Sequence, residues 1–161
     1  MSRKSLLVKA KKGNILAVEK LLDQGLDIDY LSKQKQTALI LASKHGHLDL
    51  VKFLLDKGAD PNVQDSYSYT ALAYAIRNKN ISIAQLLLEQ GADPNVKDVL
   101  GTTHITASVQ GRLDMIKLLL DAGADPNIQD NYGRTSLSHA LAYKQGRMTT
   151  RKLLILYGGT M

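Results

Sequence analysis

Cysteine is absent from this sequence of 161 residues. Its absence excludes disulfide bonds, thiolate metal ligands and a cysteine nucleophile. It leaves the cellular compartment open, because a chain without cysteine tolerates oxidising and reducing surroundings alike.

Long hydrophobic runs are also missing. The all-apolar runs, such as Leu153–Tyr157, are far too short to cross a bilayer, so we predict no membrane span. Residues 1–14 carry charges but no apolar stretch of the length found in a signal peptide.

Recognisable catalytic motifs are lacking too. The sequence has no HExxH motif, no phosphate-binding glycine loop and no paired-glycine dinucleotide fingerprint. His45 and His47 are two residues apart, so on a helix they do not face one ligand. Residues 121–130 lack the glutamate and spacing of a calcium loop, and no nucleophile has a plausible base beside it. We therefore predict that the protein is not an enzyme and holds no cofactor or metal.

The charge is basic overall but unevenly placed. The net charge is +6, made of +5 in residues 1–57, −3 in residues 58–136 and +4 in residues 137–161. A nucleic-acid binder more often shows one continuous basic face. We favour solvated lysines on helix surfaces, and keep binding of nucleic acid or another acidic surface through the basic ends as the alternative.

One pentapeptide, GADPN, occurs three times. Its copies begin at Gly58, Gly91 and Gly123, and a weaker copy begins at Gly25. A second marker lies 12 residues before each copy and is glycine in most of them. A fixed period of this size indicates stacked repeats, none of which can bury its apolar face alone. We divide the chain into five units, at about residues 1–32, 33–65, 66–98, 99–130 and 131–161, which together form a single domain.

Each unit predicts a helix, a turn, a second helix and a loop. In the second unit Thr37 can cap the first helix, Gly46 suits a left-handed turn, and residues 48–55 are apolar enough for a buried helix. Gly58 can end that helix in the left-handed conformation. Within GADPN the short polar side chains of Asp60 and Asn62 can satisfy backbone groups of the turn.

The pattern Thr-Ala-Leu…Ala…Gly-His…Leu-Leu…Gly-Ala-Asp-Pro-Asn resembles the ankyrin repeat over essentially the whole chain. The resemblance implies an all-α solenoid of about five helix-turn-helix repeats with short β-hairpin fingers. It also implies a concave binding face made by the fingers and first helices. Pro61 departs from the valine usual in that family, and we expect it to stiffen the exit from the helix.

The first and last units carry polar residues where inner units are apolar. The replacements are Lys9 and Lys20 in the first unit, and Thr150 and Arg151 in the last. Because a repeat array must cover its two exposed ends with polar faces, we expect these units to be caps and the array to be complete.

Three irregularities break the pattern. We place a one-residue deletion in the loop Val99–Gly101, which puts His104 at a partly buried position as a neutral, hydrogen-bonded histidine; in the alternative register Ile105 takes that position. Lys79 replaces a turn glycine, so we expect Asn78 or Asn80 to adopt the left-handed conformation. The third irregularity is a two-residue insertion that lengthens the last inter-helix turn, between residues 142 and 146.

Recognition residues follow from the resemblance by register. The partner-binding positions that it implies are Lys33, Gln34, Gln36, Lys44, His45, Ser66, Tyr67, Tyr69, Arg77, Asn78, Val99, Leu100, Gln110, Asn131, Tyr132, Arg134 and Tyr143. Tyrosine and arginine are enriched at binding hot spots. Tyr74 lies beside these positions and is the tyrosine most expected in the core. Replacing Tyr67 and Tyr132 together by alanine should weaken the binding of a partner by on the order of 2–4 kcal/mol.

The predicted function is therefore that of a protein-binding module. We expect a monomer that binds one protein partner through its concave face, as an adaptor, a modulator or an inhibitor of an enzyme. The Lys/Gln/Asn-rich composition looks like that of bacterial ankyrin proteins. The cytoplasm is the default location, and the bacterial periplasm or secretion applies if a signal peptide has been removed.

Overall fold

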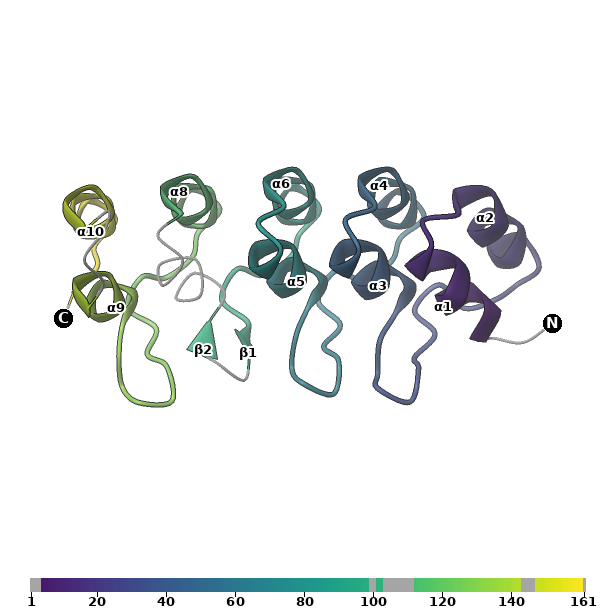
Figure 1. The fold of residues 1–161 in the computed structure, drawn as a ribbon, viewed down its shortest axis with the longest axis horizontal. Helices are drawn as coiled ribbons and strands as arrows, with labels where there is room; N and C mark the ends of the chain where they lie inside the picture. Colours follow the sequence, from purple (N-terminus) through teal and green to yellow (C-terminus); the bar gives the residue numbers. More distant parts are fainter. Residues whose placement is uncertain (1–3, 99–100, 103–111, 143–146, 161) are drawn as a thin grey trace. The chain divides into compact units, whose positions relative to one another are not determined.

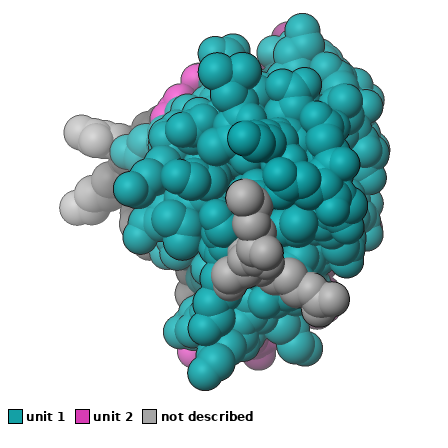
Figure 2. All heavy atoms as spheres, turned by 90° about the vertical axis from the view of Figure 1, so that its right-hand side faces the viewer, with its two compact units in different colours: residues 1–92 teal, residues 93–161 magenta. Residues whose placement is uncertain are grey.

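A computed structural model describes residues 4–98, 101–102, 112–142 and 147–160. Across these ranges the chain is mainly helical (Figure 1). The elements in chain order are α1 (Lys4–Lys11), α2 (Ile15–Asp23), α3 (Ala38–Lys44), α4 (Leu48–Asp56), α5 (Ala71–Arg77), α6 (Ile81–Glu89), β1 (Lys97–Asp98), β2 (Gly101–Thr102), α8 (Leu113–Asp121), α9 (Ser136–Ala142) and α10 (Arg147–Leu156). They fall into two compact units, residues 1–92 and residues 93–161, coloured separately in Figure 2.

The first unit is built from two layers of helices. The first helices of successive repeats, α1, α3 and α5, pack side by side, and α2, α4 and α6 form the second layer (Figure 1). Fully buried alanines such as Ala42 and Ala75 let the first helices approach closely, while Leu50, Leu54 and Leu87 fill the second layer. The loops between repeats extend from the edge of the first-helix layer.

Side chains of the turns begin the helices, as the sequence predicts for Thr37. The hydroxyl of Thr37 accepts a hydrogen bond from the backbone N–H of Ile40 at 3.2 Å, and Thr70 does the same for Ala73. Asn14 caps α2 in the same way by accepting from Ala17 at 3.0 Å. These caps satisfy N–H groups that have no partner inside the helix.

The turn between α5 and α6 corrects one expectation. Lys79 itself has a φ of +60°, whereas Asn78 and Asn80 keep negative φ angles. The two asparagines are engaged elsewhere: Asn80 caps α6 through Ile83, and the side chain of Asn78 donates to the carbonyl of Lys44 at 2.7 Å. A lysine therefore bears the left-handed strain that Gly13 and Gly46 relieve in the two equivalent turns that the structure describes.

The GADPN segments join neighbouring repeats within each unit. The N–H of Asn62 donates to Asp60 Oδ1 at 2.8 Å, which confirms the predicted local role of that aspartate. The Asn62 side chain also donates to the carbonyl of Gly91, one repeat further on, at 3.1 Å. In the second unit Asn95 donates to the carbonyl of Gly123 and accepts from the N–H of Asp125. The asparagine is thus a link between repeats.

The second unit contains β1, β2, α8, α9 and α10. Helix α10 packs against α8 and α9, around a core that includes Met115, Leu119, Leu137 and Leu154. Strands β1 and β2 form an antiparallel pair in which Asp98 lies opposite Gly101. Two residues of the sequence separate Asp98 from Gly101, whereas three separate Asp65 from Tyr69, whose backbone groups close a loop of the first unit. The one-residue deletion is expected in the segment Val99–Gly101, part of which lies outside the described residues.

Three further expectations have different outcomes. β-Hairpin fingers are not confirmed beyond that one pair, because the other described loops are turns without strands. Thr150 is only 3% exposed, so it does not belong to a polar end face as expected; Lys20 and Arg151 are exposed. His104, Ile105 and the insertion before Gly146 lie outside the described residues. The cap units and the single domain stay predictions.

Candidate functional site

A polar side chain accepts backbone hydrogen bonds within three of the described loops between repeats, and in two of them it is a buried aspartate. In the first unit Asp65 is 4% exposed, and its Oδ1 accepts the backbone N–H groups of Tyr67 at 2.9 Å and Tyr69 at 3.1 Å. The N–H of Asp65 in turn donates to the carbonyl of Tyr69 at 3.0 Å. In the preceding repeat Ser32 has the equivalent role, accepting from the N–H groups of Gln34 and Gln36. The loop backbones are therefore held before any partner arrives.

The second oxygen of Asp65 fixes a core tyrosine. Tyr74, 8% exposed as the sequence predicts for a core residue, donates its hydroxyl to Asp65 Oδ2 at 2.8 Å. Burial, together with this hydrogen bond and the nearby negative charge, raises the pKa of Tyr74 to about 12. The phenol therefore stays protonated at neutral pH and keeps donating to Asp65.

Cations lie over the tyrosines of this region. The Arg77 guanidinium is centred 4.9 Å from the ring of Tyr69, and it donates to the Tyr69 hydroxyl at 3.1 Å. The Lys44 ammonium lies 4.8 Å from the centre of the Tyr74 ring, and the rings of Tyr69 and Tyr74 are 5.4 Å apart. Such contacts hold the cationic side chains in defined positions.

These groups surround an open depression of about 490 Å³, which we call the tyrosine depression. It is lined by Lys44, His45, Tyr67, Tyr69, Tyr74, Arg77 and Asn78. Tyr67 is 58% exposed, so its ring is available for contact. The lining contains two permanent cations and no carboxylate, since the nearby Asp65 is buried beneath the loop.

A second hollow of about 310 Å³ continues along the same edge. Its lining shares Lys44 and His45 with the tyrosine depression and adds Leu7, Val8, Lys11, Ser32, Gln36 and Leu41. Val8 is 51% exposed. The two hollows lie next to each other along the edge formed by α1, α3 and α5, and the positive charge of Lys44 lies where they meet.

The second unit has a counterpart of the buried aspartate. Asp130, 6% exposed, accepts the N–H groups of Tyr132 and Arg134 on Oδ1, while Oδ2 accepts from His139 and the Arg134 guanidinium. Burial alone would raise the pKa of this carboxyl, but the hydrogen bonds from Arg134, His139 and Tyr132 lower it well below its usual range. Tyr132 is 82% exposed, with the Arg134 guanidinium 4.8 Å from its ring centre.

Comparison with known families decides what kind of repeat this is. A family model described as ankyrin repeats (3 copies) matches residues 6–98, and one described as ankyrin repeats (many copies) matches residues 104–151. The chain belongs to the ankyrin-repeat family. Ankyrin repeats are in general protein–protein interaction modules. A comparison with curated proteins gave no match.

The repeat edge brings together some of the residues predicted from sequence. Six of the predicted residues line the tyrosine depression, and Gln36 lines the adjoining hollow. Lys33, Gln34 and Ser66 are exposed on the loops without lining either hollow. Asn131, Tyr132 and Arg134 are exposed in the second unit. Val99, Leu100, Gln110 and Tyr143 lie outside the described residues.

Sequence reasoning missed the buried aspartates of these ankyrin repeats. A signal was present: Ser32, Asp65 and Asp130 share one repeat position, and Tyr74 and His139 follow the two aspartates after nine residues. Their role was not predicted, because periodicity does not show that the loop backbone folds back onto these side chains.

In the described ranges, no helix combines the length and the apolar character that a bilayer crossing needs. Among the same residues, no three histidine, cysteine, aspartate or glutamate side chains cluster as metal ligands would.

Proposed function

We propose that the chain binds one protein partner through the first-helix and loop edge of the first unit, with the tyrosine depression at the centre of the contact. The observation that carries this proposal is the convergence of Lys44, Arg77 and Tyr67 on one open depression. Tyrosine and arginine contribute large contact areas at low entropic cost and are typical of binding hot spots.

Charge identifies the partner segment more closely. Lys44 and Arg77 leave the lining positive, and no exposed carboxylate in the lining balances them. An acidic partner segment that also carries an aromatic or aliphatic side chain would match both the cations and the Tyr67 ring. Through such a contact the protein would act as an adaptor, a modulator or an inhibitor of an enzyme.

A charge-reversal capture experiment tests this proposal. Immobilised wild-type protein and the Lys44→Glu/Arg77→Glu variant would be incubated with extract of the source organism, and captured proteins would be quantified by mass spectrometry. Lys52→Glu, on an exposed site of α4, controls for the added negative charge. The expected partner is captured by the wild type and by Lys52→Glu, but is depleted at least about tenfold with the double variant.

Two results would contradict the proposal. One is equal capture by the wild type and the double variant. The other is capture mainly of nucleic acid, detected by staining the eluate, with binding that falls steeply with salt; this would favour the basic ends instead. Circular dichroism of each variant shows whether the helices remain folded.

A further inference from the structure

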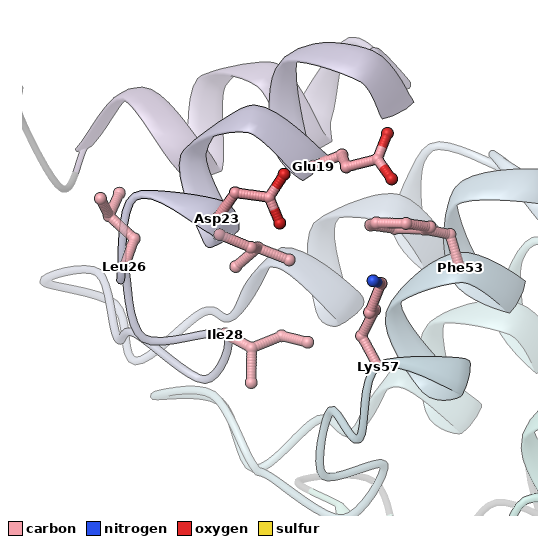
Figure 3. A pocket seen from close by; sticks show the side chains of 7 residues that line it. Glu19, Asp23, Leu26, Ile28, Phe53 and Lys57 are labelled. Atoms are coloured by element: carbon pink, nitrogen blue, oxygen red, sulfur yellow. The ribbon is translucent and has the colours of Figure 1, made fainter.

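A separate pocket of mixed apolar and charged lining lies between the second helices of the first two repeats (Figure 3). Its volume is about 260 Å³, and its lining consists of Glu19, Leu22, Asp23, Leu26, Ile28, Phe53 and Lys57. The pocket belongs to α2, the loop that follows it and α4, so it shares no residue with the tyrosine depression. Its apolar wall carries charges at the rim, with two carboxylates on α2 and one ammonium from α4.

The two carboxylates break a pattern that the other second helices keep. Glu19 and Asp23 are one helical turn apart, where like charges destabilise a helix. At the same two positions of α6, Gln85 donates to Glu89 at 2.8 Å. In α4 and α8 the first of these positions is lysine. Helix α2 alone therefore has a carboxylate at the position where the equivalent helices have a hydrogen-bond donor. The repulsion lowers the stability of the helix, which points to a role of these carboxylates outside the fold.

No ion pair relieves this repulsion within the described residues. The ion pairs found there involve Asp114, with Arg112, and Asp130. Lys57, the cation nearest along the pocket wall, instead lies over the ring of Phe53, with its ammonium 5.6 Å from the ring centre. The carboxylates of the pocket are therefore available to an external cation.

Phe53 supplies an aromatic face at the same place. It is the only phenylalanine of the chain, and the equivalent residues of the next two second helices are Leu86 and Leu118. Figure 3 shows Lys57 on one side of the ring and Glu19 on the other, with Asp23 beyond the edge of the ring. An aromatic face next to carboxylates attracts a cation in two ways at once, through the ring quadrupole and through charge.

We propose that this pocket binds an arginine side chain of a partner protein. The pocket is smaller than the roughly 300–1,000 Å³ of small-molecule sites, which suits one long side chain. A planar guanidinium can stack on the Phe53 ring while it donates hydrogen bonds to two separate carboxylates, a combination that the compact ammonium of lysine cannot reproduce. The aliphatic stem of arginine would lie along Leu26 and Ile28.

The test is a titration followed by NMR of the whole chain. Amide shifts would be recorded with the peptide acetyl-Leu-Arg-Leu-amide and with its citrulline analogue, which keeps the shape but lacks the charge. We expect saturable shifts on α2 and α4 with the arginine peptide, and binding weaker by about fivefold or more with the citrulline peptide. Phe53→Leu introduces the residue that the next two repeats have at this position. Both Phe53→Leu and Glu19→Gln should weaken binding of the arginine peptide to a similar extent.

Glu89→Gln is the matched control, because it removes a carboxylate at the end of α6, outside the pocket. It should leave the titration unchanged. The proposal is overturned by equal shifts with arginine and citrulline peptides, by equal affinity for a lysine peptide, or by no shifts on α2 and α4. Shifts of these amides that depend on protein concentration without peptide would assign the pocket to a second copy of the chain and would also overturn it.

Discussion

Asp29 occupies the position at which the GADPN copies have asparagine, so Asp29→Asn should stabilise the protein. Asn62, Asn95 and Asn127 each donate a side-chain hydrogen bond to a glycine carbonyl of the following repeat, at 3.1, 3.3 and 3.0 Å. A carboxylate at Asp29 can accept from the N–H of Asp60, which it does at 3.2 Å, but it cannot donate. Asparagine should add the missing bond to the first unit.

The magnitude follows from one hydrogen bond and one charge. A net intramolecular hydrogen bond contributes about 1 kcal/mol, and we expect the free energy of unfolding to rise by that amount. Burial raises the pKa of Asp29, and the charges of Asp60 and Asp27 raise it further, against the lowering effect of the hydrogen bond from the Asp60 backbone. A raised pKa means that ionisation of Asp29 costs stability as the pH rises. The gain from Asp29→Asn should therefore be larger at pH 7 than at pH 3.

Urea unfolding followed by circular dichroism at both pH values measures this gain. Asp27→Asn is the control, because it removes a neighbouring charge while its side-chain oxygen can still accept from the N–H of Asp29. Asn95→Asp makes the reverse change in the second unit and should cost about 1 kcal/mol. Equal stability of Asp29→Asn and the wild type at pH 7 would refute the inter-repeat link, and so would an equal gain from Asp27→Asn.

Three further predictions concern strain and buried polar groups. Lys79→Gly should raise the free energy of unfolding by about 0.5–1 kcal/mol, because glycine adopts a positive φ without strain; an unchanged urea midpoint would contradict this. Asp130→Asn should cost about 2 kcal/mol near neutral pH. The pKa of Asp130 is lowered in the fold, so its contribution to stability is present above the unfolded pKa near 3.8 and is lost as the pH falls below it. The free energies of unfolding of the wild type and Asp130→Asn should therefore converge in acid. The pKa of Tyr74 is raised to about 12, so its hydrogen bond to Asp65 stabilises the fold up to about pH 10 and is lost towards pH 12. Tyr74→Phe should reduce this loss of the free energy of unfolding at alkaline pH. The same dependence on pH in Tyr74→Phe and the wild type would count against the bond.

Much of the fold could be predicted from the sequence, because the repeat period carries it. The spacing of GADPN located the helix pairs, the Thr37 cap and the core position of Tyr74. The strain at Lys79 was misassigned, because propensity favours asparagine in left-handed turns. In the structure both neighbouring asparagines are held by other hydrogen bonds.

The candidate site was only partly predictable. Register brought Lys44, Tyr67 and Arg77 to one edge, which the structure shows as the tyrosine depression. The pocket of Figure 3 was missed because it depends on residues that do not repeat. Glu19 and Phe53 are 34 residues apart and belong to different repeats, and their contact with one pocket follows from the packing of α2 against α4.

The most direct test of the central proposal is the affinity of the captured partner for Tyr67→Ala. Tyr67 is 58% exposed and its removal leaves the buried Asp65–Tyr74 hydrogen bond in place, so the fold should be retained. Calorimetric titration should show a dissociation constant at least about tenfold higher than that of the wild type, as for a hot-spot tyrosine, while Lys52→Ala binds normally. A dissociation constant for Tyr67→Ala equal to that of the wild type would contradict the assignment of the tyrosine depression as the partner-binding surface.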